Sequence, residues 1–96
     1  MMFLLFFLLS TEFSICTTNG AQYNRDVAFD GTNFLVIWED HRSGTALYHL
    51  YGSRVTSSGS VLDPNGDRYA AQNDTVMDQS IAWGGGTYLI AYRDHC

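Results

Sequence analysis

An internal repeat is the feature of this sequence that most restricts its fold. Residues 27–41, VAFDGTNFLVIWEDH, recur fifty-four residues later without a gap as residues 81–95, IAWGGGTYLIAYRDH. Five aligned positions are identical, and five more keep their size and polarity. A repeat of about this period is typical of propellers, solenoids and arrays, in which each unit buries part of its apolar surface against a neighbour.

Each copy consists of two short apolar runs joined by a turn. Residues 34–38 form a continuous run of aromatic and β-branched side chains, which is typical of a strand buried on both faces. Gly31 and Gly85 stand at the turn of the first and of the second copy. Because Asp30 precedes Gly31, we expect this pair to supply the positive φ angles of a tight hairpin turn.

The rest of the repeat also has the pattern of short strands between turns, and no stretch after residue 16 shows helical periodicity. The expected strands of one repeat are residues 27–30, 34–38, 46–55 and 68–71. The sequence therefore predicts an all-β fold with a four-stranded, antiparallel, propeller-like blade. The predicted organisation is a connector in residues 17–26, a first blade in residues 27–72 and the first half of a second blade in residues 73–96.

A resemblance to a known family rests on these same segments. AFDGTNFLV at residues 28–36, followed by Trp38, Asp40 and Arg42, resembles a repeat that is common in secreted bacterial proteins. The later segments YGSRV and GSVLD resemble the second half of that repeat. The resemblance implies β-propellers built from long arrays of blades, and it implies little about activity.

The number of repeats sets an expectation about partners. The chain holds one full repeat and half of another, whereas a propeller needs about four to eight blades. We therefore expect either a piece of a longer reading frame or a chain that assembles with copies of itself. The partners implied are other blades of the same or a longer chain.

The amino-terminal segment has the pattern of an export signal. Its apolar run, MMFLLFFLL, is too short to span a bilayer, which needs roughly twenty residues, but fits the core of a secretory signal peptide. We assign residues 1–16 to a signal peptide, with cleavage before Thr17 or Ala21, and expect a secreted or cell-surface location. A lipoprotein anchored at Cys16 and an apolar first strand of a longer chain are the alternatives.

Charge and cysteine content exclude some classes of partner and cross-link. The net charge is −5, whereas a nucleic-acid partner requires a basic face that neutralises phosphate. Adsorption to an anionic membrane is disfavoured for the same reason. The two cysteines, Cys16 and Cys96, have a spacing that does not by itself support a disulfide.

Two Asp-His pairs are the best candidates for chemistry. Asp40 and His41 recur as Asp94 and His95, and an Asp and a His at a strand end can bind a metal or exchange protons. Recurrence favours a structural role, because scaffold residues repeat in every unit while catalytic residues usually occur once. We therefore expect the aspartates to cap the turn that follows each strand.

A weak calcium motif lies in the second half of the repeat. Asp63, Asn65 and Asp67 place oxygen atoms at alternate positions, as the start of a calcium loop does. Arg68 stands where such a loop requires Gly, and its cation would repel Ca²⁺. An ordinary turn is therefore the favoured interpretation of this segment.

Four aromatic residues could serve either binding or packing: Trp38, Trp83, Tyr88 and Tyr92. A sugar-stacking platform is one possibility, and packing between blades is the favoured one. The positions that we expect to be structural in both repeats are Gly31, Trp38, Asp40, Gly85, Tyr92 and Asp94.

The functional expectation follows from the repeat, the export signal and the lack of a unique catalytic cluster. We predict no catalytic and no cofactor-binding residue, and a non-enzymatic extracellular repeat module that binds protein or glycan. The alternative is the amino-terminal part of a secreted propeller hydrolase that acts on carbohydrate, with its active site elsewhere. A truncated gene product with no separate function is the third possibility.

Overall fold

The fold is all-β, as the sequence predicts. The computed structural model describes residues 4–7, 12–18, 20, 22–42, 48–69 and 75–95. These ranges consist of strands and their connections, and they contain no helix. It follows that none of the described ranges holds a helix able to cross a membrane.

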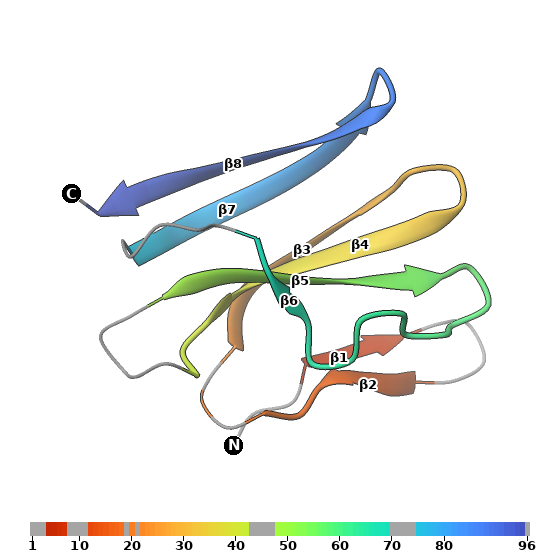
Figure 1. The fold of residues 1–96 in the computed structure, drawn as a ribbon, viewed down its shortest axis with the longest axis horizontal. Helices are drawn as coiled ribbons and strands as arrows, with labels where there is room; N and C mark the ends of the chain where they lie inside the picture. The colour runs from red at the N-terminus through yellow and green to blue at the C-terminus, as the bar shows by residue number, and fades with distance from the viewer. Residues whose placement is uncertain are drawn as a thin grey trace.

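The described ranges contain one larger sheet and two hairpins (Figure 1). The strands are β1 (Leu4–Phe7), β2 (Glu12–Cys16), β3 (Gln22–Phe29), β4 (Asn33–Asp40), β5 (His49–Thr56), β6 (Asp67–Arg68), β7 (Thr75–Gly84) and β8 (Thr87–His95). Strands β3, β4, β5 and β6 form an antiparallel sheet in that order. Strands β1–β2 and β7–β8 each form a separate antiparallel pair. The four-stranded antiparallel sheet that we predict for the first repeat is therefore present.

Two strands begin earlier than the apolar pattern indicates. Strand β3 begins at Gln22, so Gln22, Tyr23 and Asp26, which we predict as connector, pair with β4 instead. Strand β7 likewise begins at Thr75, before Ile81, the residue equivalent to the start of the first expected strand at Val27. Because most side chains of these extensions are polar, the alternation of apolar residues does not reveal that they form strands. The expected fourth strand, residues 68–71, corresponds to β6, which ends at Arg68 before the described residue Tyr69; residues 70–71 lie outside the described ranges.

The hairpins β3–β4 and β7–β8 pair in the same register. Every residue pair that faces across β3 and β4 has its equivalent, fifty-four residues later, across β7 and β8. Each first strand also has an irregularity at the same place, where Asn24 and Asp78 have positive φ angles of 52° and 55°. Asn and Asp tolerate this left-handed conformation better than most residues. The sequence repeat is therefore accompanied by a repeated backbone conformation.

The turn of the first hairpin differs in detail from our expectation. Gly31 has a φ angle of 95°, whereas Asp30 is not among the residues with positive φ. The Asp30 carboxylate instead accepts hydrogen bonds from the backbone amides of Thr32, at 2.8 Å, and Asn33, at 2.7 Å. These bonds lower the pKa of Asp30, because they stabilise its charged form. Asp30 thus caps the turn, and only Gly31 supplies the positive φ angle.

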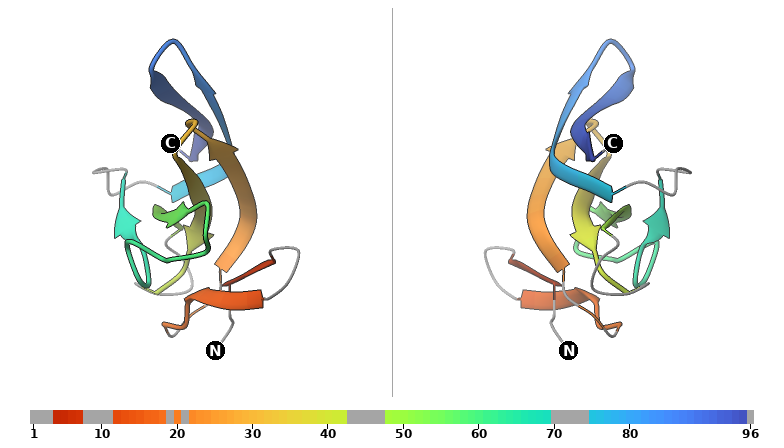
Figure 2. Two further views of the ribbon diagram at one scale, coloured as in Figure 1. Left: turned by 90° about the vertical axis from the view of Figure 1, so that its right-hand side faces the viewer. Right: turned by 90° about the vertical axis from the view of Figure 1, so that its left-hand side faces the viewer.

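The four-stranded sheet lies between the two hairpins, with β7–β8 on one side and β1–β2 on the other (Figure 2). One face of the sheet, which we call the Trp38 face, carries the buried residues Val36, Trp38 and Val55. Ile15 and Cys16 of β2 pack against this face and are buried with it. The segment that we assign to a signal peptide therefore contributes side chains to a core cluster, and its cleavage stays a prediction.

The opposite face of the sheet, which we call the Leu35 face, carries Leu35, Ile37 and Leu50. Three partly buried residues of the second hairpin pack against it: Ile81, Tyr88 and Ile90. Burial of each large aliphatic side chain contributes about 1.5–3 kcal/mol, so apolar contact is the main attraction between these layers.

Candidate functional site

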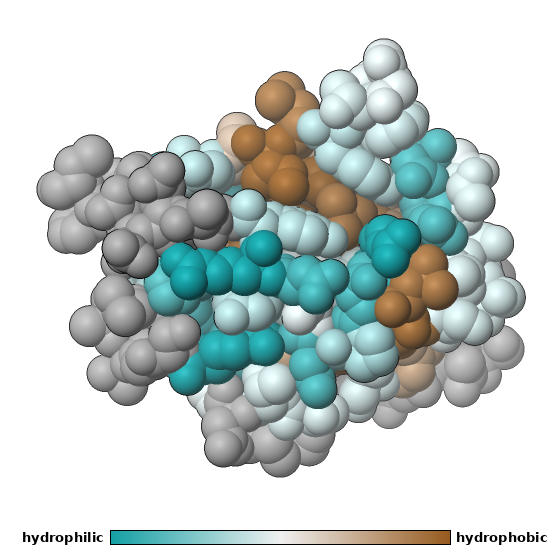
Figure 3. Space-filling view, viewed as in Figure 1, coloured by the Kyte–Doolittle hydropathy of each residue, from teal (hydrophilic) through white to brown (hydrophobic). Residues whose placement is uncertain are grey.

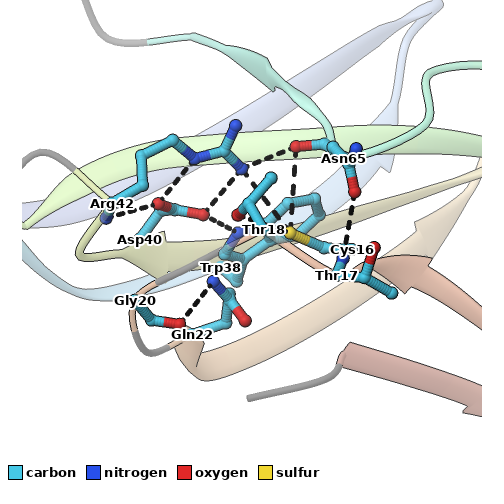
Figure 4. A network of polar contacts seen from close by, with 9 residues as sticks. All are labelled: Cys16, Thr17, Thr18, Gly20, Gln22, Trp38, Asp40, Arg42 and Asn65. Atoms are coloured by element: carbon cyan, nitrogen blue, oxygen red, sulfur yellow. Dashed lines mark hydrogen bonds and ion pairs between the residues drawn. The ribbon is translucent and has the colours of Figure 1, made fainter. Parts of the chain in front are cut away.

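The buried Asp40 carboxylate lies in a polar cluster that joins three parts of the chain (Figure 4). Its Oδ1 atom accepts hydrogen bonds from the backbone amide of Arg42 at 2.9 Å and from Arg42 Nε at 2.8 Å. Its Oδ2 atom accepts from Trp38 Nε1 and from Arg42 Nη2, each at 2.8 Å. The bond from the Arg42 amide is the turn-capping contact that we expect of Asp40.

The ionisation of the cluster follows from these contacts. Burial alone would raise the pKa of Asp40, but the hydrogen bonds from Arg42 and Trp38 outweigh burial and lower the pKa of Asp40. Burial likewise opposes the charge of Arg42, and the bonds to Asp40 outweigh it, so the pKa of Arg42 is raised. The two groups therefore form a partly buried ion pair, in which the contacts favour the charged form of each.

Arg42 extends the cluster to the amino-terminal segment and to the turn before β6. Its Nη2 atom donates to the Asn65 carbonyl oxygen at 2.6 Å and lies 3.6 Å from Cys16 Sγ. Its guanidinium also lies over the Tyr51 ring, 3.9 Å from the ring centroid, which is a cation–π contact. Arg42 thus holds β2, β5 and the turn before β6 together around the end of β4.

The saturation of Asp40 decides what the cluster can do chemically. An ionised carboxylate offers about four lone-pair positions, and four donors occupy them here. The carboxylate has no position left for a metal ion or for a substrate proton. The geometry of Asp40 therefore supports a structural role.

The two described histidines near this cluster have no polar partner on one ring nitrogen. His41 packs between aromatic rings, with centroid distances of 5.0 Å to Tyr23 and 3.9 Å to Tyr48, and its buried Nε2 atom has no hydrogen-bond partner among the described residues. His49 is buried next to Asp40 in the sheet, and its Nδ1 atom is likewise unpaired there. Burial, assisted by the positive charge of Arg68, lowers the pKa of His49.

The second copy of the Asp-His pair lacks the partners of the first. Trp38 corresponds to Tyr92, which has no ring N–H, and Arg42 corresponds to Cys96. Tyr92 is 42% exposed, whereas Trp38 is fully buried. The side chains of Asp94 and His95 lie outside the described residues. The Asp-His dipeptide recurs in the sequence, but the group of residues around Asp40 does not.

The calcium candidates have other partners in the structure. Both carboxylate oxygens of Asp63 bind the Arg54 guanidinium at 2.9 Å, and this interaction lowers the pKa of Asp63. Asn65 Oδ1 accepts a hydrogen bond from the backbone amide of Thr17 at 2.9 Å, and Asp67 is exposed in β6. Among the residues that the structure describes, no three His, Cys, Asp or Glu side chains gather as metal ligands.

The aromatic candidates divide between core and surface. Trp38 is fully buried, and Tyr88 is partly buried against the Leu35 face. Trp83 and Tyr92 are 39% and 42% exposed, so core packing does not account for all four. Phe29, which we did not single out, occupies the first-repeat position of Trp83 and is 44% exposed.

Sequence reasoning also missed the polar contacts between the two repeats. Glu39 is buried and accepts hydrogen bonds from the Asn24 side chain and, at 2.9 Å, from the Asp78 backbone amide. Asp26 Oδ2 accepts from the Ile81 backbone amide at 3.0 Å. Asn24 and Asp78 occupy equivalent positions of the repeat, and this shared polar position is the signal that could have located the contact.

No known protein family, curated protein or solved structure matches this chain. The resemblance to a repeat of secreted bacterial proteins therefore stays a prediction from the residues quoted above.

Proposed function

We propose that this chain is a non-enzymatic extracellular repeat module, in which stacked antiparallel layers act as blades of the β-propeller type and bind a protein or a glycan. The observation that carries the proposal is the packing of one repeat on the next in a common register. The second hairpin places Ile81 and Ile90 on the Leu35 face of the first sheet. Packing of this kind extends by repetition, as in repeat proteins generally.

The aromatic residues near the hairpin turns support a glycan as the ligand to test first. In each hairpin an aromatic pair directly precedes and follows the turn region: the ring centroids are 4.7 Å apart in Phe29–Phe34 and 4.8 Å apart in Trp83–Tyr88. The two turns lie at the same end of the molecule (Figure 1). Exposed aromatic rings offer large, rigid contact area, which is the usual composition of a binding surface.

The proposal is tested by protection of Trp83 from a collisional quencher. Acrylamide quenches Trp83 selectively in the folded chain, because Trp38, the other tryptophan, is fully buried. Soluble oligosaccharides that bind at the hairpin turns should reduce quenching of Trp83 in a saturable manner and be recovered intact. Phe29→Ser should weaken this protection, whereas Leu62→Ser, at an exposed apolar residue of the loop before β6, should not.

Two results would count against the proposal. One is a folded chain in which neither the oligosaccharides nor a set of extracellular proteins, tested in the same way, changes the quenching of Trp83. The other is conversion of the oligosaccharide to shorter products, since this would favour a hydrolase over a binding module.

A further inference from the structure

The outer face of the β7–β8 hairpin is an uncovered copy of a face that is buried in the first repeat. It carries Ala82, Leu89 and Ala91, and Leu89 is 70% exposed. The position equivalent to Leu89 in the first repeat is Leu35, which is 5% exposed beneath the second hairpin. In the space-filling view, an apolar patch lies over this hairpin (Figure 3).

The chain also contains the kind of surface that covers such a face. This surface is the Trp38 face, and strand β2 already packs on it. Val36 and Trp38 on the Trp38 face correspond to Ile90 and Tyr92 of the second hairpin, and Ile90 is part of the surface that packs on the Leu35 face. If further layers packed in the same way, the Trp38 face would pack on the outer face of a preceding layer. In this structure strand β2 packs on the Trp38 face instead, with Ile15 as its large aliphatic side chain.

We infer that the outer face of β7–β8 in one copy binds the Trp38 face of a second copy, and that β1–β2 blocks this contact in the full chain. The inference rests on the proposed function, since it extends the same packing of layers from one chain to two. It joins the two copies head to tail, an arrangement that leaves a complementary face at each end for further copies. The partner is thus a second copy of this chain, docked by the interface that its own two repeats already form.

The block by β1–β2 is held by specific contacts to the sheet. The Asn65 backbone amide donates to the Ile15 carbonyl oxygen at 2.9 Å, and the Thr17 amide donates to Asn65 Oδ1 at 2.9 Å. A segment tethered in this way competes at an effective concentration in the millimolar range. The full chain should therefore stay monomeric at micromolar concentration. Cleavage before Thr17 or Ala21, which we predict from the export signal, would remove β1–β2 and uncover the Trp38 face.

The contact between copies should be weaker than the contact between repeats. The hydrogen bonds between the repeats include those that Asp26 and Glu39 accept, and the equivalent positions on the outer hairpin are Ser80 and Arg93. Arg93 cannot accept the backbone hydrogen bond that Glu39 accepts. Association should accordingly be reversible and depend on chain concentration.

The test uses the full chain and displaces the block by substitution. Ile15→Asp places a charge in the apolar contact between β2 and the Trp38 face. In light scattering, the wild-type chain should remain a monomer up to about 100 μM, below the effective concentration of the tethered segment. Ile15→Asp should show a mass that rises with concentration, and adding Leu89→Asp should restore the monomer. Adding Leu62→Asp instead, at an exposed leucine outside the hairpin, should leave association unchanged.

Several outcomes would overturn the inference. A folded Ile15→Asp variant that stays monomeric would show that the Trp38 face does not bind a second copy. Association that survives Leu89→Asp would assign it to another surface, such as the outer edge of β8. A wild-type chain that already associates through Leu89 would refute the block by β1–β2.

A milder variant keeps the inference testable if Ile15→Asp lacks a cooperative unfolding transition. Ile15→Ala removes the contact without adding a charge, and it should strengthen association by about tenfold or more relative to wild type. Leu89→Asp must again reverse the effect. Neither measurement requires a ligand, so a failure of glycan binding and a failure of association are distinguishable.

Discussion

Glu39 accepts a hydrogen bond from the backbone amide of Asp78 at 2.9 Å, and this bond links the end of the first hairpin to the bulge of the second. Asn24, at the equivalent bulge of the first hairpin, donates to the same carboxylate oxygen. The buried side chain of Glu39 thus lies between two repeated irregularities of the backbone. Stacking of the repeats depends on this polar contact as well as on the apolar face.

Removal of the Glu39 carboxylate should therefore destabilise the fold. Glu39→Ala removes a buried acceptor and leaves the Asn24 amide and the Asp78 backbone N–H, whose contacts to it are partly buried, without their partner. We expect the free energy of unfolding to fall by about 1–3 kcal/mol in urea titrations followed by far-UV circular dichroism. The matched control is Arg93→Ala at the equivalent position of the second hairpin.

The control should behave differently because Arg93 is exposed. Its ion pair with Asp78 joins side chains that are 66% and 62% exposed, and such surface pairs contribute about 0–1 kcal/mol. Equal destabilisation by the two substitutions would contradict the assigned role of Glu39.

The Asp40–Arg42 pair should make stability depend on pH in the acid range. Because the pKa of Asp40 is lowered in the folded chain, the pair stabilises the fold fully above the ordinary carboxyl pKa of about 3.9. This stabilisation is lost as the pH falls through the lowered pKa. Asp40→Asn should flatten the fall in unfolding free energy below about pH 4 by up to about 1.4 kcal/mol per pH unit.

The comparison with Asp40→Asn separates this carboxyl group from the others that titrate in the same range. Asp30 and Asp63 also have lowered pKa values, and both are retained in wild type and variant. A direct check is the side-chain carboxyl resonance of Asp40 in an NMR titration. An Asp40 pKa at or above about 3.9 would show that Arg42 and Trp38 do not stabilise the charged form of Asp40 in the folded chain.

The hairpins could be predicted because short-range signals determine them. Apolar residues at β4 and β8, with Gly31 and Gly85 at the turns, place both strand pairs correctly. The extensions of β3 and β7 could not be found in this way, because polar residues in them make contacts between layers. Gln79 donates a hydrogen bond to the Asn24 carbonyl oxygen, and the Ile81 amide donates to Asp26, across intervals that no local pattern reveals.

The candidate site shows another limit of prediction from the sequence, because a motif can recur without the residues that surround it. Recurrence of Asp-His indicated a common role for Asp40 and Asp94, but the residues that occupy the Asp40 carboxylate are Trp38 and Arg42. Trp38, Asp40 and Arg42 alternate along the chain, which places them on one face at the end of a strand. This alternation, together with the replacement of Trp38 by Tyr92 and of Arg42 by Cys96 in the second copy, predicts different roles for Asp40 and Asp94.

The turn before β6 should be sensitive to a single methyl group. Gly66 has a φ angle of 78°, and a Cβ atom there would come within 2.6 Å of the Trp38 ring. Gly66→Ala should lower the unfolding free energy by about 1–2 kcal/mol for the backbone and a further 1–3 kcal/mol for overpacking. Gly31→Ala is the control, because its φ angle is 95° and the added Cβ meets nothing within 4 Å. A similar cost for the two variants in urea titrations would argue against close packing of Gly66 on Trp38.

The rate at which a reagent modifies the Cys16 thiol should measure how stably β2 packs on the Trp38 face. Cys16 is fully buried on the Trp38 face and lies 3.6 Å from Arg42 Nη2. In a Cys96→Ser background, where Cys16 is the remaining cysteine, a thiol reagent should modify the folded chain only as fast as β2 detaches or the chain unfolds. Ile15→Ala should accelerate modification by about tenfold or more, because it weakens the contact of β2 with the sheet. Leu62→Ala, at an exposed residue, should leave the rate within about twofold of wild type. Rapid modification of the otherwise unaltered Cys96→Ser chain, without denaturant, would show that β2 does not rest stably on the Trp38 face.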